Sequence, residues 1–177
     1  DWILGGFYST DDVQVRTPGF LDHLFGTQVL ITADQDTTSY AAFAHGEWAL
    51  TDRLSLVTGA RYTHEEKDYV GGTLDTNPFG VSGLVAMNPF CPGLALPCQL
   101  SFADTSIEDE FLSWRLGLDW RVDADTLIYV SASRGQKSGG FFSGITLAAP
   151  QLAPYASEEL TAYEVGIKWQ IPDSHVR

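Results

Sequence analysis

The sequence predicts an all-β protein: a segment of about six antiparallel strands from a larger transmembrane β-barrel, with long extracellular loops. Three observations predict this fold class. Apolar and polar side chains alternate along six segments, the connections between these segments are alternately short and long, and tryptophan recurs at one end of the segments. Successive side chains of an extended chain point to opposite faces, so the alternation indicates strands with one apolar and one polar side.

The first three predicted strands show this alternation with one exception. In residues 1–9, Trp, Leu and Tyr occupy even positions. In residues 39–50, the even positions carry Tyr, Ala, Ala, Gly and Trp, and only Phe43 places a large apolar side chain on the other face. In residues 53–67, an apolar set of Leu, Leu, Ala and Tyr opposes Ser, Gly, Arg, Thr and Glu. Each segment therefore has one apolar face.

The last three predicted strands include the clearest one. In residues 112–122, the even positions are Leu, Trp, Leu, Leu, Trp and Val, while the odd positions are Ser, Arg, Gly, Asp and Arg. Residues 126–134 alternate more weakly. In residues 161–170, Tyr, Val, Ile and Trp oppose Glu, Gly, Lys and Gln. A helix would instead distribute these charges around its circumference.

The connections indicate which strand ends lie together. The short connections, near residues 51–52, 123–125 and 172–174, are rich in turn-forming Asp, Pro and Ser. The long connections cover roughly residues 10–38, 67–110 and 135–158. Because consecutive strands are antiparallel, all short turns lie at one end and all long loops at the other. Bacterial outer-membrane barrels have this arrangement.

The aromatic residues provide an independent indication of a membrane. From Tyr40 to Trp48 the strand spans about 26 Å, or about 20 Å when tilted, close to the ~25 Å apolar band between the aromatic girdles of outer-membrane barrels. Trp and Tyr favour the headgroup level. A soluble β-sandwich also has alternating strands, but rarely contains such long loops. The predicted aromatic girdle comprises Trp2, Trp48, Trp120 and Trp169 at the short-turn end, and Tyr40, Tyr62 and Tyr163 toward the loop end.

Composition excludes some functions and indicates a larger parent protein. The net charge of -13 argues against nucleic-acid binding, which needs a basic surface. The sequence has no run of 18 apolar residues that predicts a transmembrane helix. It begins at Asp1, and Met87 is its only methionine. We therefore expect these 177 residues to be part of a longer chain.

Three segments, residues 37–69, 112–141 and 157–177, resemble consecutive barrel hairpins of TonB-dependent outer-membrane receptors, in the order that this family has. The matching phrases are SYAAF in residues 39–43, GARYT in residues 59–63, the stretch from Tyr129 to Gly140, and YEVGIK in residues 163–168. The resemblance covers most of residues 36–177, and residues 1–9 resemble the preceding strand. It implies that residues 1–177 are part of a 22-stranded barrel. The signal peptide, the plug domain and the C-terminus of the barrel would lie outside these residues.

The resemblance also implies a function. Such receptors, in the outer membrane of Gram-negative bacteria, import ferric siderophores, other iron complexes, cobalamin or some oligosaccharides with energy from the TonB complex. A ferric siderophore or similar iron complex is the expected ligand here. The expected partners are the TonB complex, acting through the plug, and outer-membrane lipid and lipopolysaccharide. A passive porin and an autotransporter or adhesin barrel are alternatives with the same strand pattern.

The expected site residues are binding residues and not catalytic ones. The predicted polar face would line the lumen of the barrel, and the loops would contact the ligand. The lumen-facing charges are Arg61, Glu65, Arg115, Asp119, Glu164 and Lys168. The candidate ligand-contact residues are Lys137, Phe141 and Phe142, followed by Tyr69 and Phe79.

We predict neither an enzyme nor a cofactor or metal site. The four histidines have no metal-ligand spacing, and no nucleophile elbow, phosphate loop or CxxC motif occurs. Cys91 and Cys98 lie in a predicted extracellular loop. The oxidising cell surface favours a disulfide between them, with a metal-binding pair as the alternative. The acidic residues of the loops are expected to form a solvated surface, with divalent-cation binding as the alternative.

Overall fold

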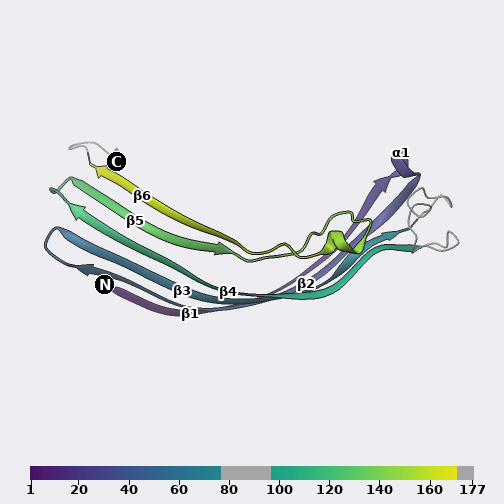
Figure 1. Cartoon of the computed structure of the whole chain (residues 1–177), viewed down its shortest axis with the longest axis horizontal. Helices are drawn as coiled ribbons and strands as arrows, with labels where there is room; N and C mark the ends of the chain where they lie inside the picture. The colour runs from purple at the N-terminus through teal and green to yellow at the C-terminus, as the bar shows by residue number, and fades with distance from the viewer. Residues whose placement is uncertain (77–96, 171–177) are drawn as a thin grey trace.

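The computed structural model describes residues 1–76 and 97–170, which form one antiparallel sheet of six strands in sequence order (Figure 1). This confirms the predicted fold class. The strands are β1 (Trp2–Leu21), β2 (Thr27–Ala49), β3 (Leu54–Asp75), β4 (Cys98–Arg121), β5 (Thr126–Lys137) and β6 (Glu158–Trp169).

All strand ends that were predicted to carry short turns lie together, on the left of Figure 1. Side chains stabilise both turns locally. The Thr51 hydroxyl accepts hydrogen bonds from the backbone N–H groups of Arg53 and Leu54, at 3.2 and 3.0 Å. The carboxylate of Asp123 accepts one from the N–H of Asp125 at 2.9 Å. These contacts are typical of Asx and Ser/Thr turns.

The predicted loop boundaries are wrong in the described parts of the chain. Residues 10–38 are β-hairpin, with both strands continuing to the short helix α1 (Asp22–Phe25) and to Gly26 in the left-handed conformation at φ 66°. Within the predicted loop 67–110, β3 continues to Asp75 and β4 begins at Cys98. Within 135–158, β5 continues to Lys137 and a 3₁₀ turn, η2 (Ala149–Leu152), follows.

The error has a physical reason. In the stretch from Asp34 to Ser39, both faces carry polar side chains, so no alternation marks the strand in the sequence. The backbone nevertheless pairs without interruption, from Trp2 opposite Gly46 to Leu21 opposite Thr27. Hydrogen bonding between neighbouring strands extends the hairpin where the hydrophobic pattern has stopped. Among the described residues, no helix is long and apolar enough to cross a membrane.

The sheet has two distinct faces. We call the face with Trp2, Trp48, Trp120 and Trp169 the outer face, and the opposite one the inner face. The strand register keeps the alternating sets together: Trp120, for example, lies opposite Leu54 on β3 and Ile128 on β5.

Buried residues gather on the inner face toward the loop end. There the connection between β5 and β6 lies over the concave side of the bent sheet (Figure 1). One cluster contains Ala33, Tyr69, Phe141 and Leu152. A second contains Val29, Cys98 and Leu100, where a register shift between Thr73 and Leu74 interrupts the regular pairing of β3 with β4. The first cluster therefore lies between the β5–β6 connection and the strands, whereas the second packs against Leu21 and Phe25 beside α1.

Candidate functional site

The outer face toward the short turns has a surface suited to lipid. The side chains in the predicted girdle are exposed on this face: the residue exposure is 48–74% for the four Trp and 45–82% for the three Tyr. Tyr8 pairs directly with Tyr40 and adds to the tyrosine end of the girdle. Apolar side chains occupy the strands between the two aromatic ends. The register thus places the predicted girdle residues on one continuous apolar face.

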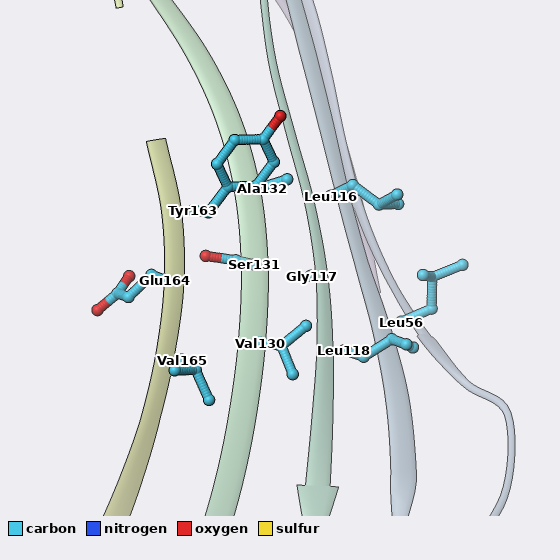
Figure 2. A pocket seen from close by; sticks show the side chains of 10 residues that line it. All are labelled: Leu56, Leu116, Gly117, Leu118, Val130, Ser131, Ala132, Tyr163, Glu164 and Val165. Atoms are coloured by element: carbon cyan, nitrogen blue, oxygen red, sulfur yellow. The ribbon is translucent and has the colours of Figure 1, made fainter. Parts of the chain in front are cut away.

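A shallow apolar hollow lies on this outer face (Figure 2). The small side chain of Ala132 stands between Leu116 on β4 and Tyr163 on β6, which are its cross-strand neighbours. Larger neighbours on both sides of an alanine leave a depression. Val130 and Val165 continue its apolar lining. Ser131 and Glu164, which the register places on the inner face, also line the hollow, while the outer-face side chains have the chemistry of a contact with acyl chains.

The inner face carries the charges that were predicted to line the lumen, and several have partners. Arg61 lies 5.0 Å from the ring centroid of Phe7, and Lys168 lies 5.3 Å from that of Tyr129. The Tyr129 hydroxyl donates a hydrogen bond to Glu164 at 2.7 Å. That this face lines the lumen of a closed barrel stays a prediction. The charges that the register places on the inner face are Arg61, Glu65, Arg115, Asp119, Glu164 and Lys168.

A polar cluster attaches the β5–β6 connection to this inner face. Lys67 on β3 donates to the Ser138 hydroxyl at 2.6 Å and to the carbonyl of Gly139 at 2.7 Å, and it forms an ion pair with Glu65 at 2.8 Å. Ser138 also donates to Glu65. The N–H of Gly139 donates to Asp109 on β4 at 2.8 Å. A Cβ atom on Gly139 would approach the carbonyl oxygen of Tyr155 to 2.5 Å, so the close approach requires glycine here.

The Glu65 carboxylate is perturbed by its neighbours in this cluster. Its burial acts to raise the pKa, but hydrogen bonds from Lys67 and Ser138 outweigh the burial, so the pKa of Glu65 lies below its usual value. The carboxylate is therefore charged at neutral pH and holds both partners. The alternation in the sequence predicts Glu65 as a lumen charge, but it does not indicate the roles of Lys67 and Ser138. Their contacts depend on the path of the loop, which no local pattern indicates.

The candidate ligand-contact residues have different environments. Tyr69 lies on β3 and not in a loop, and its ring stacks on Phe141 with centroids 4.6 Å apart. Both are buried, at 2% and 9% exposure. Phe142 is 53% exposed, and Lys137 is exposed with its ammonium group 5.9 Å from the ring centroid of Tyr155. Ligand contact by these residues stays a prediction.

Two predicted features involve residues outside the described part of the chain. Phe79 and Cys91 both lie there. Cys98 begins β4, is buried, and is disulfide-bonded. The pairing of Cys98 with Cys91 stays a prediction.

One cluster escaped the sequence analysis. His64 on β3 and two glutamates on β4, Glu108 and Glu110, converge on the outer face, at the loop end of the girdle. In sequence, the histidine lies more than forty residues from the acids. Only the pairing of β3 with β4 brings them together. The sequence pattern did not predict this pairing, because both glutamates fall in the predicted loop 67–110.

A family model matches the chain, and the curated relatives that match it include pesticin receptors of two Yersinia species. The family model described as "TonB dependent receptor-like, beta-barrel" matches residues 1–175. The pesticin receptors of Yersinia pestis and Yersinia enterocolitica are each 25% identical to the chain over 135 residues, which is 75% of this chain. The chain spans only 16% of the length of these relatives.

Two solved structures resemble the fold. The ferric yersiniabactin uptake receptor from Yersinia pestis matches 98% of this chain with a TM-score of 0.69 at 16% identity, and the match covers 24% of that receptor. The ferric-catecholate import receptor from E. coli matches 96% of this chain with a TM-score of 0.57 at 13% identity, over 30% of its length. At these identities, the likeness is one of fold.

Proposed function

Because the chain belongs to the TonB-dependent receptor family and matches its β-barrel domain, we propose that it forms part of the wall and extracellular loops of an outer-membrane active transporter. The transported ligand is a ferric siderophore or a similar iron complex. The relatives support this choice, since they include a ferric yersiniabactin uptake receptor and a ferric-catecholate import receptor. The chain itself has a binding and transport role and not an enzymatic one.

The observation that carries the proposal is the packing of the β5–β6 connection on the inner face. Lys67 and Asp109 hydrogen-bond Ser138 and Gly139 and so hold the connection on the inner face. These contacts hold the segment over the inner face while Phe142 stays exposed. Loops that a rigid scaffold positions are common binding elements.

The proposed mechanism assigns this chain capture and containment. Its exposed loop groups, with Lys137 and Phe142 as candidates, contact the iron complex from the extracellular side. The inner-face charges keep the path toward the plug hydrated. The TonB complex supplies energy through a plug domain encoded outside these residues. The girdle holds the wall in the outer membrane of a Gram-negative bacterium, against lipid and lipopolysaccharide.

Ligand binding to the full-length receptor tests this proposal. We expect purified receptor in detergent to bind ferric yersiniabactin or a ferric catecholate saturably, and to bind the iron-free compounds more weakly. We also expect expression of the intact gene to rise when iron is withheld. Expression that follows a sugar and ignores iron, together with no binding of either ferric complex, would refute the choice of ligand.

A conductance measurement separates the active receptor from a passive porin. In a planar lipid bilayer, a receptor with a plug gives little steady ion current, whereas a diffusion channel conducts at once. The full-length protein should therefore conduct poorly until the plug is removed or unfolded.

A further inference from the structure

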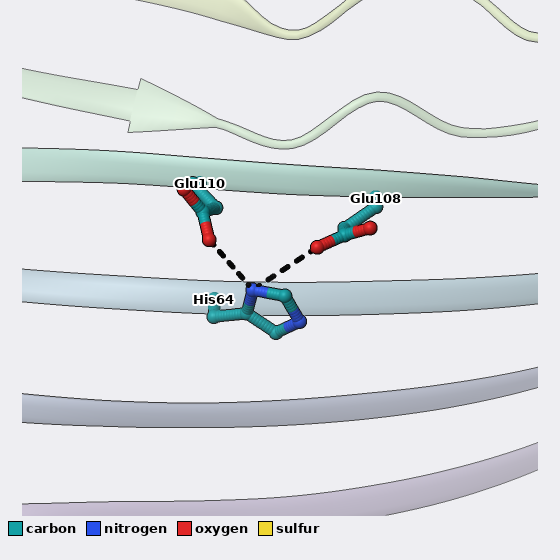
Figure 3. Close-up of side chains that lie close together, drawn as sticks. All are labelled: His64, Glu108 and Glu110. Carbon is teal, nitrogen blue, oxygen red and sulfur yellow. Dashed lines mark hydrogen bonds and ion pairs between the residues drawn. The ribbon is translucent and has the colours of Figure 1, made fainter.

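His64, Glu108 and Glu110 form a compact group of three side chains on the outer face (Figure 3). His64 lies directly opposite Glu110 in the register of β3 with β4, and Glu108 lies two residues along the same face. The Nδ1 atom of His64 is 3.3 Å from Oε1 of Glu110 and 3.5 Å from Oε1 of Glu108. One possible ligand atom from each residue lies within 4.8 Å of those from the other two.

The His64–Glu110 contact is a long hydrogen bond and the His64–Glu108 contact is an ion pair, and both separations also suit neighbouring ligands of one metal ion. A charge-assisted N–H···O bond is about 2.7–2.9 Å long. A single imidazole N–H group that faces two carboxylates forms at most one well-aligned hydrogen bond. Two ligands of a tetrahedral metal ion, each bound at about 2.1 Å, lie about 3.4 Å apart. The two measured distances fall on either side of that value.

The surroundings of His64 fix the geometry of the group. Tyr40 on β2 stacks on the imidazole, with ring centroids 4.6 Å apart and planes 21° from parallel. The His64 side chain is only 13% exposed, while those of Glu108 and Glu110 are 63% and 59% exposed. The ring is thus held against the sheet and the carboxylates are accessible from outside.

We propose that His64, Glu108 and Glu110 bind a divalent transition-metal ion of the zinc type at the extracellular boundary of the girdle. A donor set of one imidazole and two carboxylates favours such borderline ions, since calcium and magnesium prefer oxygen ligands alone. The site lies on the outer face, away from the β5–β6 connection. It goes beyond the proposed transport function and does not depend on which iron complex is imported.

Zinc titration of the full-length receptor in detergent tests the proposal. The receptor is first stripped with a chelator, and bound Zn²⁺ is then measured by equilibrium dialysis. We expect the wild type to bind one equivalent that His64→Gln lacks or binds at least about tenfold more weakly. Glu110→Gln, which preserves side-chain size, should show the same loss and serves as a second variant if His64→Gln does not fold.

The matched control is Asp68→Asn, because Asp68 is exposed on the same face of β3 but lies outside the group. It should retain the full equivalent of Zn²⁺. If His64→Gln binds Zn²⁺ as the wild type does, or if Asp68→Asn loses as much binding as His64→Gln, the site does not exist. Binding of the ferric siderophore should stay unchanged in all three variants. A failure of the zinc proposal can therefore be distinguished from a failure of the proposed transport function.

Discussion

Phe141 and Phe142 are adjacent in the sequence but have opposite environments. Phe141 is buried against Tyr69, and Phe142 is exposed. The sequence could indicate two aromatic residues at the base of a loop, but it could not assign one to packing and the other to the surface. That distinction depends on contacts between β3 and a loop about seventy residues away, which are invisible to local patterns.

The two phenylalanines give a matched pair of variants. Phe141→Ala should leave a cavity beside Tyr69 and destabilise the packed β5–β6 connection by about 3–5 kcal/mol. Hydrogen exchange of residues 138–152 should then become faster. Phe142→Ala removes an exposed ring and should leave exchange unchanged, while weakening binding of the iron complex if Phe142 contacts it. Equal exchange in the two variants would contradict the assigned packing.

Glu65 predicts a pH dependence of the same segment. Because its pKa is lower in the folded state than in the unfolded chain, its stabilising effect is present above the ordinary glutamate value of about 4.3 and is lost as pH falls through the folded value. A spin label at Ser143, which is exposed, should therefore be ordered at pH 7 and become mobile as the pH falls through the lowered pKa of Glu65.

Glu65→Gln is the control for this pH dependence. It removes the titrating group and the negative partner of Lys67, so the spin label should be more mobile at pH 7. Its mobility should also change less on acidification. If acidification mobilises the label equally in the wild type and in Glu65→Gln, contacts other than those of Glu65 hold the segment.

At the scale of strands, the sequence predicts a strand correctly where one face is apolar and the other is polar. The sequence predicted the strands between the two aromatic ends because lipid on one face and polar surroundings on the other enforce strict alternation. The halves of β1 to β4 that lie far from the short turns were predicted as loops, because both faces are polar in stretches such as residues 34–39. Backbone pairing, which has no side-chain signature, continues these strands.

The two faces of β6 should respond differently to the same charge. Val165→Arg places a cation on the outer face and should lower the free energy of unfolding by about 2–4 kcal/mol, as measured by urea titration of the full-length receptor in lipid. Ala162→Arg introduces the same side chain on the inner face, at an exposed position, and should cost less than about 1 kcal/mol. Equal costs would contradict the assignment of the outer face to lipid.

The whole molecule combines two environments along its strands. Toward the short turns, the outer face is apolar and exposed, as a wall against lipid must be. Toward the loops, the inner face carries a small core beneath the β5–β6 connection. At about 3.3 Å per residue, the 23 residues of β2 extend about 76 Å, well beyond a ~25 Å apolar band. Much of β2 therefore extends beyond the length that such an apolar band covers.

A polypeptide of these 177 residues alone should not fold stably in water. The sheet exposes large apolar side chains from Trp2 to Trp169, and β1 and β6 are edge strands. Exposed edges beside an apolar face favour aggregation. We expect the isolated polypeptide to form aggregates on size-exclusion chromatography and to lack a cooperative thermal transition. A soluble monomer with a sharp transition would contradict this expectation.

Uptake by living cells tests the central claim most directly. Cells that express the full-length receptor should accumulate iron from a labelled ferric siderophore when the TonB complex is functional. Accumulation should fall to background in otherwise identical cells without TonB. Uptake at the same rate in both strains would contradict active transport and would indicate a passive channel.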